Sequence, residues 1–246
     1  MPWWYAVAER DHELQNPTSR EKIVRLGQTL RLTPASRVLD VACGKGGPAI
    51  VLAQEFGCHI KGVERAREFV AEARERVARA GLEDRVEIVE QDATAFELQP
   101  DRYDVAMCLG ATFIWRNLDG TLEALTPTVR KHGHVAIGEV YLCKQVPDGV
   151  QVPDGVQGYE EFVPLADTAA RFAYAGLELI TLIASSLDDW DRYESLHWRA
   201  VDDWLIANPD DPEADEFRRR NDAYRRDHLS WRRETLGWGI FVARKH

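Results

Sequence analysis

Short apolar runs and longer amphipathic stretches alternate along most of the chain. The stretch 66–80 places Phe69, Ala73 and Val77 on one face, which is the spacing of a surface helix, and Gly81 follows as a stop signal. Apolar runs short enough for buried strands begin at Val38 and recur at 58–63, 85–89, 104–109, 134–141, 177–183 and 237–243. Because strands that alternate with helices pair in parallel, the pattern predicts an α/β fold with a doubly wound, mostly parallel seven-stranded sheet.

Two segments depart from this alternation. The hexapeptide at 145–150 is repeated without change at 151–156, and its Pro-Asp-Gly core is typical of a turn, so we expect a surface loop there. The stretch 187–235 is polar and helical in character but rich in aromatic residues, which predicts a helical insertion before the last strand. We expect one domain over 1–246, divided into an N-terminal helical cap (1–34), a core (35–186), the insertion or lid (187–235) and the final strand (236–246).

Composition narrows the function classes. The net charge of −10 and pI near 5.2 disfavour binding to a phosphate backbone, so we expect no nucleic-acid partner. The N-terminus lacks the pattern of a signal peptide, and no apolar run approaches the length of a membrane span. The four cysteines show no Cys-x-x-Cys spacing, which favours a reducing compartment. These observations predict a cytoplasmic protein without a membrane partner, and they leave its oligomeric state open.

Residues 38–47, Val-Leu-Asp-Val-Ala-Cys-Gly-Lys-Gly-Gly, carry the strongest chemical signal. They place one carboxylate, Asp40, inside an apolar strand that runs into a glycine-rich turn and then a helix. A buried carboxylate is costly unless a partner stabilises it, and glycines at the carboxyl end of a strand let a ligand approach the backbone. This combination predicts a small-molecule site.

Four landmarks in order resemble the class I S-adenosylmethionine-dependent methyltransferases, over about residues 36–141 and the final strand. They are 38–47, Glu64 at the end of the second strand, 91–93 after the third, and 103–110 as the fourth strand. Two positions depart from the family pattern. Ala42 stands where glycine is more frequent, and Lys45 places a cation where threonine or serine is common.

The resemblance implies a Rossmann-like core that binds S-adenosyl-L-methionine and releases S-adenosyl-L-homocysteine. Asp40 is implied near the methionine moiety, Glu64 at the ribose hydroxyls and Asp92 at the adenine amino group. The implied cofactor-binding residues are Asp40, Ala42, Cys43, Gly44, Gly46, Glu64, Arg65, Asp92, Ala93, Cys108 and Leu109. The implied reaction is in-line transfer of a methyl group to a small-molecule acceptor.

Two other function classes stay open at this point. Gly44-x-Gly46-x-x-Ala49 also fits a dinucleotide-binding fingerprint, as in an NAD(P)-dependent oxidoreductase, and a non-catalytic S-adenosylmethionine-binding protein would show the same motifs.

Residues that contact the acceptor are less clearly marked. Candidates for a base or a substrate-orienting group are Glu139, Tyr141 and His12, and candidate substrate contacts are Trp115, Trp190 and Tyr193. His132-x-His134 lacks further ligands at usable spacing, so no metal is expected.

Overall fold

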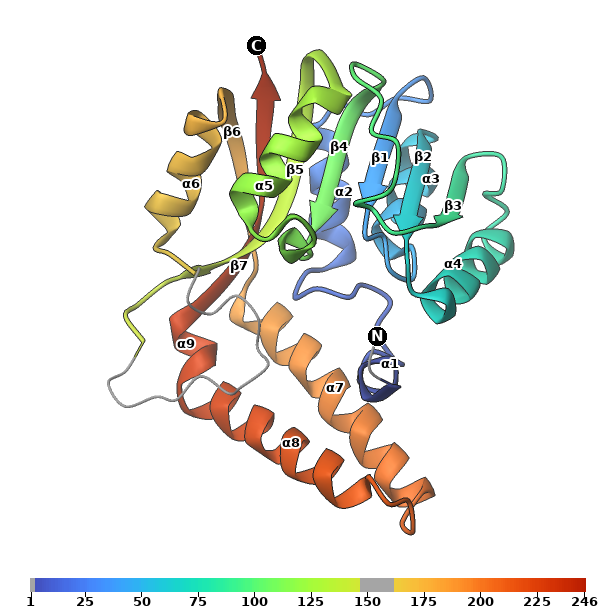
Figure 1. The fold of residues 1–246 in the computed structure, drawn as a ribbon, viewed down its shortest axis with the longest axis vertical. Helices are drawn as coiled ribbons and strands as arrows, with labels where there is room; N and C mark the ends of the chain where they lie inside the picture. The colour runs from blue at the N-terminus through green and yellow to red at the C-terminus, as the bar shows by residue number, and fades with distance from the viewer. Residues whose placement is uncertain (1–2, 147–161) are drawn as a thin grey trace.

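A seven-stranded sheet organises the molecule in the computed structural model, which describes residues 3–146 and 162–246 (Figure 1). The strand order is β3-β2-β1-β4-β5-β7-β6. The strands are β1 (Arg37–Val41), β2 (His59–Glu64), β3 (Val86–Glu90), β4 (Tyr103–Leu109), β5 (Val129–Leu142), β6 (Leu177–Ala184) and β7 (Leu236–Lys245). All seven predicted strands are present, with ends that differ by a few residues.

The sheet is parallel except around its seventh strand. Strands β3, β2, β1, β4 and β5 pair in parallel, whereas β7 lies antiparallel between β5 and β6. Strand order reverses at β1, whose neighbours are β2 and β4. Open α/β sheets bind ligands beyond the carboxyl ends of the strands at such a reversal. The predicted fold class is confirmed, and it places the glycine turn after β1 at this position.

Helices cover both faces of the sheet. Helices α2 (Arg20–Thr29), α3 (Gly47–Phe56) and α4 (Arg67–Arg79) bury apolar side chains in the core on one face. Helices α5 (Leu118–Leu125) and α6 (Leu165–Tyr174) do the same on the other. Local sequence sets their ends: the Ser19 side chain caps α2 by accepting from the Lys22 N–H, and Gly57 ends α3 with φ of +65°.

The remaining helices lie beyond the carboxyl ends of the parallel strands (Figure 1). They are α1 (Trp3–Ala8), α7 (Leu187–Ala207), α8 (Ala214–Asp227), the π-helical turn η4 (His228–Arg232) and α9 (Arg233–Thr235), with short 3₁₀ turns η1 (Thr112–Trp115) and η2 (Thr126–Thr128) elsewhere. Helix α1 packs on α7 and α8 through a separate apolar cluster, where the Trp3 ring lies 4.9 Å from that of Trp204 and 5.1 Å from that of Phe217. The segment from α1 to α2 is therefore held between the sheet and α7.

Several polar contacts fasten this segment to the start of α7. The Arg192 guanidinium donates to the Thr18 carbonyl, the Ser185 hydroxyl to the Pro17 carbonyl, and Lys22 pairs with Asp189. The capping box of α7 holds that carboxylate in place.

Two further points bear on the sequence analysis. The repeated hexapeptide lies almost entirely within residues 147–161, outside the described part of the chain, so its loop remains a prediction. Among the described helices, none combines the length and the apolar character needed to cross a bilayer.

Candidate functional site

The turn between β1 and α3 brings the backbone close to open space at the sheet edge. Ala42 and Gly44 both have left-handed backbones, with φ of +55° and +54°. A Cβ on Gly44 would lie 2.1 Å from the side-chain oxygen of Gln15, so a larger residue would displace this side chain as well as strain the backbone. Ala42 adopts a conformation that glycine reaches without strain, which explains in physical terms why glycine is the more frequent residue there.

Glu64, at the end of β2, is fixed by three backbone N–H groups. Its Oε2 accepts from Gly44 (3.1 Å), and its Oε1 accepts from Arg65 (2.9 Å) and Ala66 (2.8 Å). The side chain is nearly buried but borders the cavity described below. Oε1 thus accepts two bonds and Oε2 one, which leaves a lone pair of Oε2 for a hydroxyl group of a ligand.

Asp40, in β1, is the least satisfied carboxyl at the site. It is 2% exposed, and its Oδ2 has no hydrogen-bond partner among the described residues. Burial, together with the negative charge of Glu64, raises its pKa to about 8. A ligand that brings a positive charge or hydrogen-bond donors would relieve this cost, so the orphaned oxygen fits a cationic ligand.

A cavity of about 470 Å³, here called the smaller cavity, joins these groups. Nine of the predicted cofactor residues line it: Asp40, Ala42, Cys43, Gly44, Glu64, Arg65, Asp92, Ala93 and Leu109. Gly46 and Cys108 do not. Gly46 is the N-cap of α3, where an added Cβ would meet Ala73, and Cys108 is fully buried within β4.

Asp92 and Arg65 also line the smaller cavity, and they follow β3 and β2 in the chain. Asp92 Oδ1 accepts from the Thr94 N–H (2.9 Å) and from its hydroxyl (2.6 Å), and these bonds hold the pKa of Asp92 below its usual value. The Arg65 guanidinium lies 3.7 Å from the same carboxylate. Asp92 is thus an ionised acceptor beside the cavity.

Sequence reasoning missed the contribution of the N-terminal segment to this wall. Gln15 Oε1 accepts from the Lys45 N–H (2.7 Å), and Asn16 Nδ2 donates to the Leu109 carbonyl (3.0 Å). Both side chains line the smaller cavity. The segment has neither helical nor strand periodicity, so no local signal indicated this position.

A second cavity of about 690 Å³, the larger cavity, lies beneath α7 and α8. Of the predicted acceptor-site residues, Glu139, Trp190 and Tyr193 line it. Trp115, Tyr141 and His12 line neither cavity. Trp115 packs against the core under α5, and the Tyr141 ring lies edge-on to Phe241 at 6.2 Å. His12 is buried beside Glu9 and His197.

The two cavities share a wall. Residues that line both are Trp4, Tyr5, Gln15, Asn16, Gly110 and Phe113. Gly110 has φ of +85°, and a Cβ there would lie 2.2 Å from Asn16 Oδ1. The structure therefore places two ligand-sized spaces side by side, with the N-terminal segment and the end of β4 between them.

Lys45 does not face either cavity, although it lies in the glycine turn. Its side chain is 1% exposed, and its Nζ donates to the carbonyls of Glu9 (3.0 Å), Arg10 (2.9 Å) and His12 (3.2 Å). The charge is paired with Glu72 Oε1 at 2.9 Å. Lys45 thus fastens the N-terminal segment over the site instead of contacting a ligand.

Comparison with known proteins agrees with this geometry. The profile of the methyltransferase domain family matches residues 38–133. The uncharacterised protein YjhP of Escherichia coli is 31% identical over 220 residues, which cover 89% of this chain and 88% of YjhP. A methyltransferase structure from Geobacter sulfurreducens, in complex with S-adenosylhomocysteine, is 34% identical with a TM-score of 0.90, and the match covers 100% of this chain and 99% of that one.

A second such complex, from Thiobacillus denitrificans, is 28% identical, also has a TM-score of 0.90, and covers 100% of this chain and 99% of that one. The likeness thus extends over the whole chain, including the helices beyond the sheet, and is not limited to the glycine turn that a nicotinamide-binding fold could share. With the carboxylates of Asp40 and Glu64 in place at the sheet edge, the chain belongs to the class I S-adenosylmethionine-dependent methyltransferases.

Proposed function

We propose that this methyltransferase transfers the methyl group of S-adenosylmethionine to a small-molecule acceptor held in the larger cavity. The observation that carries the proposal is the wall shared by the two cavities, because methyl transfer needs the donor and the acceptor in contact and in line. A volume of about 690 Å³ lies within the range of small-molecule sites, which is roughly 300–1,000 Å³.

The cofactor belongs in the smaller cavity, where the donor set matches its chemistry. S-adenosylmethionine carries an ammonium, a sulfonium, a ribose diol and an adenine. Asp40 offers an unsatisfied oxygen for the cationic methionine end, and Glu64 offers a fixed carboxylate for the diol. Asp92 can accept from the adenine amino group, as the resemblance implies.

The larger cavity combines aromatic and charged walls. Trp190, Tyr193, Trp198, Tyr224, Phe217 and Trp238 supply aromatic surface. The described lining also includes four arginines, Arg116, Arg171, Arg220 and Arg232, against the two carboxylates of Glu139 and Glu194. Arg171 lies 3.7 Å from Asp119 and Arg232 lies 3.7 Å from Glu194. The positive charge of Arg116 and Arg220, together with the aromatic rings, favours a planar acceptor that bears a negatively charged group.

The protein contributes mainly positioning and exclusion of water. The cofactor supplies a methyl carbon already activated by the positive sulfur, so a base is needed only where the acceptor must lose a proton. Glu139, which lines the larger cavity, is the candidate for that base among the three predicted at the outset. Segments 1–34 and 187–235 act as a lid, because residues of both line the larger cavity and polar contacts join the two segments.

Two measurements test this function. Calorimetry with purified protein should register binding of S-adenosylmethionine and S-adenosylhomocysteine, and thermal stabilisation by NAD without stabilisation by these compounds would contradict it. The purified protein and cofactor labelled in the methyl group are then added to an untreated cell extract and to an extract depleted of small metabolites. We expect label in the low-mass fraction of the untreated extract. Label confined to protein or nucleic acid would refute a small-molecule acceptor, and binding without any transfer would favour a non-catalytic role.

The lid is tested by limited proteolysis. Cofactor is expected to protect segments 1–34 and 187–235 from cleavage. Cleavage that is equally fast with and without cofactor would contradict the lid while leaving methyl transfer untouched.

A further inference from the structure

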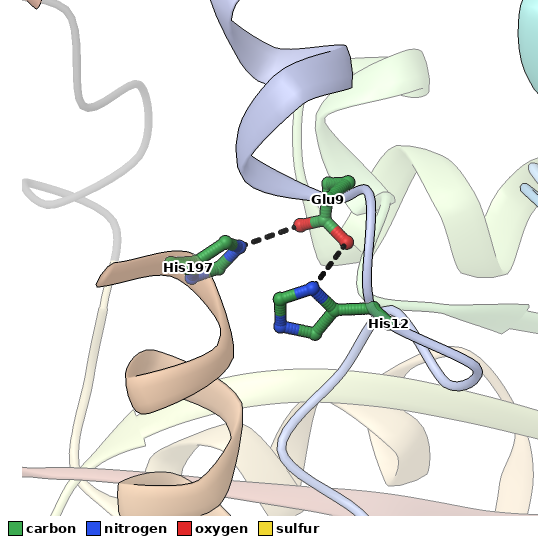
Figure 2. Close-up of side chains that lie close together, drawn as sticks. All are labelled: Glu9, His12 and His197. Carbon is green, nitrogen blue, oxygen red and sulfur yellow. Dashed lines mark hydrogen bonds and ion pairs between the residues drawn. The ribbon is translucent and has the colours of Figure 1, made fainter. Parts of the chain in front are cut away.

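A buried cluster of Glu9, His12 and His197 lies beside the larger cavity and has no role in the function proposed above. Figure 2 shows the three side chains pointing toward one another, two from the segment after α1 and one from α7. Glu9 is 0% exposed and His12 2%, and the ligand-type atoms of all three lie within 4.8 Å of one another. His197 also lines the larger cavity.

The hydrogen bonds of the cluster leave two acceptor atoms facing each other. His12 Nε2 lies 2.9 Å from the Tyr193 carbonyl and must donate to it, so the neutral ring has a lone pair at Nδ1. His12 Nδ1 lies 3.7 Å from Glu9 Oε2, and neither of these atoms has a hydrogen-bond partner among the described residues. Two buried acceptors at this separation need a positive centre or a donor between them.

The other half of the Glu9 carboxylate is already engaged. His197 Nε2 lies 2.9 Å from Oε1, and the Tyr193 hydroxyl donates to the same oxygen at 3.2 Å. Glu9 therefore has two donors at Oε1, while its Oε2 is left without a hydrogen bond and faces His12.

We propose that Glu9, His12 and His197 form a binding site for a divalent transition-metal ion of the Zn²⁺ type. Imidazole and carboxylate are ligands that suit such ions. Ligand atoms on a tetrahedral zinc ion lie roughly 3.3–3.6 Å apart, and the two orphaned atoms are separated by 3.7 Å, so Glu9 Oε2 and His12 Nδ1 need to move little. When His197 joins as the third ligand through Nε2, the neutral ring carries its single proton on Nδ1 instead, the nitrogen that faces Glu194.

The surrounding charges are compatible with an added cation. The nearest ammonium, that of Lys45, is paired with Glu72, and it donates to backbone carbonyls of the segment. Glu194 Oε2 lies 4.0 Å from His197 Nδ1 and supplies a second carboxylate, which Arg232 approaches at 3.7 Å. A fourth ligand position would be taken by water or by an oxygen of a molecule in the larger cavity, because His197 borders that space.

No local pattern in the sequence indicates this cluster. The expectation of no metal was based on His132 and His134, which lack further ligands. His197 and Glu9 are 188 positions apart, and only the docking of the N-terminal segment on α7 brings them together.

The test uses full-length protein without a histidine tag, treated with a chelator and then titrated with Zn²⁺ or Co²⁺. Equilibrium dialysis with elemental analysis should give one bound ion per chain, and bound Co²⁺ should show the visible absorption of a four-coordinate site. We expect His12→Gln and His197→Gln each to weaken binding on the order of 100-fold or more. The matched control is His228→Gln, a buried histidine whose Nδ1 is also unpartnered but which lies outside the cluster.

Circular dichroism and binding of S-adenosylhomocysteine establish that each variant is folded. If His12→Gln fails to fold, His197→Gln gives the same test, because its ring borders the larger cavity and is less buried. Failure of the wild-type protein to bind either ion, or equal loss in the His228 control, would overturn the proposal. A water molecule that donates to both Glu9 Oε2 and His12 Nδ1 would then satisfy these two acceptor atoms.

Discussion

Replacing Lys45 with methionine tests whether this buried cation fastens the N-terminal segment over the site. Methionine retains most of the aliphatic stem but removes the ammonium group. Three carbonyl groups lose a donor, namely those of Glu9, Arg10 and His12. The ion pair to Glu72 is lost as well. The Glu9 carbonyl keeps the bond from the His12 N–H at 3.1 Å, so the main penalty falls on the other two carbonyls.

The magnitude follows from these contacts. Loss of its partner costs about 2 kcal/mol for the buried carbonyl of His12 and about 1 kcal/mol for the partly buried carbonyl of Arg10, which gives about 3 kcal/mol for the two. The Glu72 side chain is 39% exposed and regains water, so its contribution is small. For a domain of this size, a loss of about 3 kcal/mol lowers the Tm by roughly 10 °C. Because the lost bonds hold one segment, amide hydrogen exchange should increase first in residues 3–12.

Lys61→Met is the matched control for chemical denaturation and hydrogen exchange. Lys61 makes one ion pair, to Glu87 at 2.8 Å, and both side chains are substantially exposed. We expect this change to alter the free energy of unfolding by less than about 0.5 kcal/mol. If Lys45→Met is equally mild and exchange in 3–12 is unchanged, the reasoning about Lys45 is refuted.

Three further predictions concern the edge of the sheet. Ala42→Gly should leave the free energy of unfolding unchanged or raise it by up to about 1 kcal/mol, because it relieves a left-handed alanine; a loss above about 0.5 kcal/mol in urea denaturation would contradict this. The raised pKa of Asp40 contributes stability that is complete at low pH and is lost as the pH rises toward about 8. Between pH 6 and 8 the wild-type protein should therefore lose about 2 kcal/mol relative to Asp40→Asn, and parallel pH profiles would argue against a buried, unpaired carboxyl. Glu64→Ala should weaken binding of S-adenosylhomocysteine by about 1–3 kcal/mol in calorimetry, whereas Glu87→Ala should not; equal affinities would remove Glu64 from the site.

Much of the fold was predictable because its signals are local. Buried strands appear in the sequence as apolar runs. Gly57 and Gly81 mark the ends of helices, because glycine adopts the left-handed backbone found there. The position of Asp40 and Glu64 followed from the rule that ligands bind beyond the carboxyl ends of parallel strands. Sequence position alone did not show that Gly46 and Cys108 lie away from the cavity, since that depends on the packing of α3 and β4.

The N-terminal contacts were not predictable, because they join segments far apart in the chain. Gln15 meets the turn at Lys45, and Asn16 meets the end of β4 at Leu109. The segment that carries them has no periodicity to indicate a partner. Lys45 itself was identified as a departure from the family pattern, but its partners became visible only in three dimensions.

The shared wall also links the release of the two products of turnover. Tyr5, Gln15 and Asn16 border both cavities, so one displacement of this stretch would unseal the two compartments simultaneously. Departure of the spent donor and departure of the methylated product would then pass through a single gate, and a mutation that slows one exit should slow the other as well.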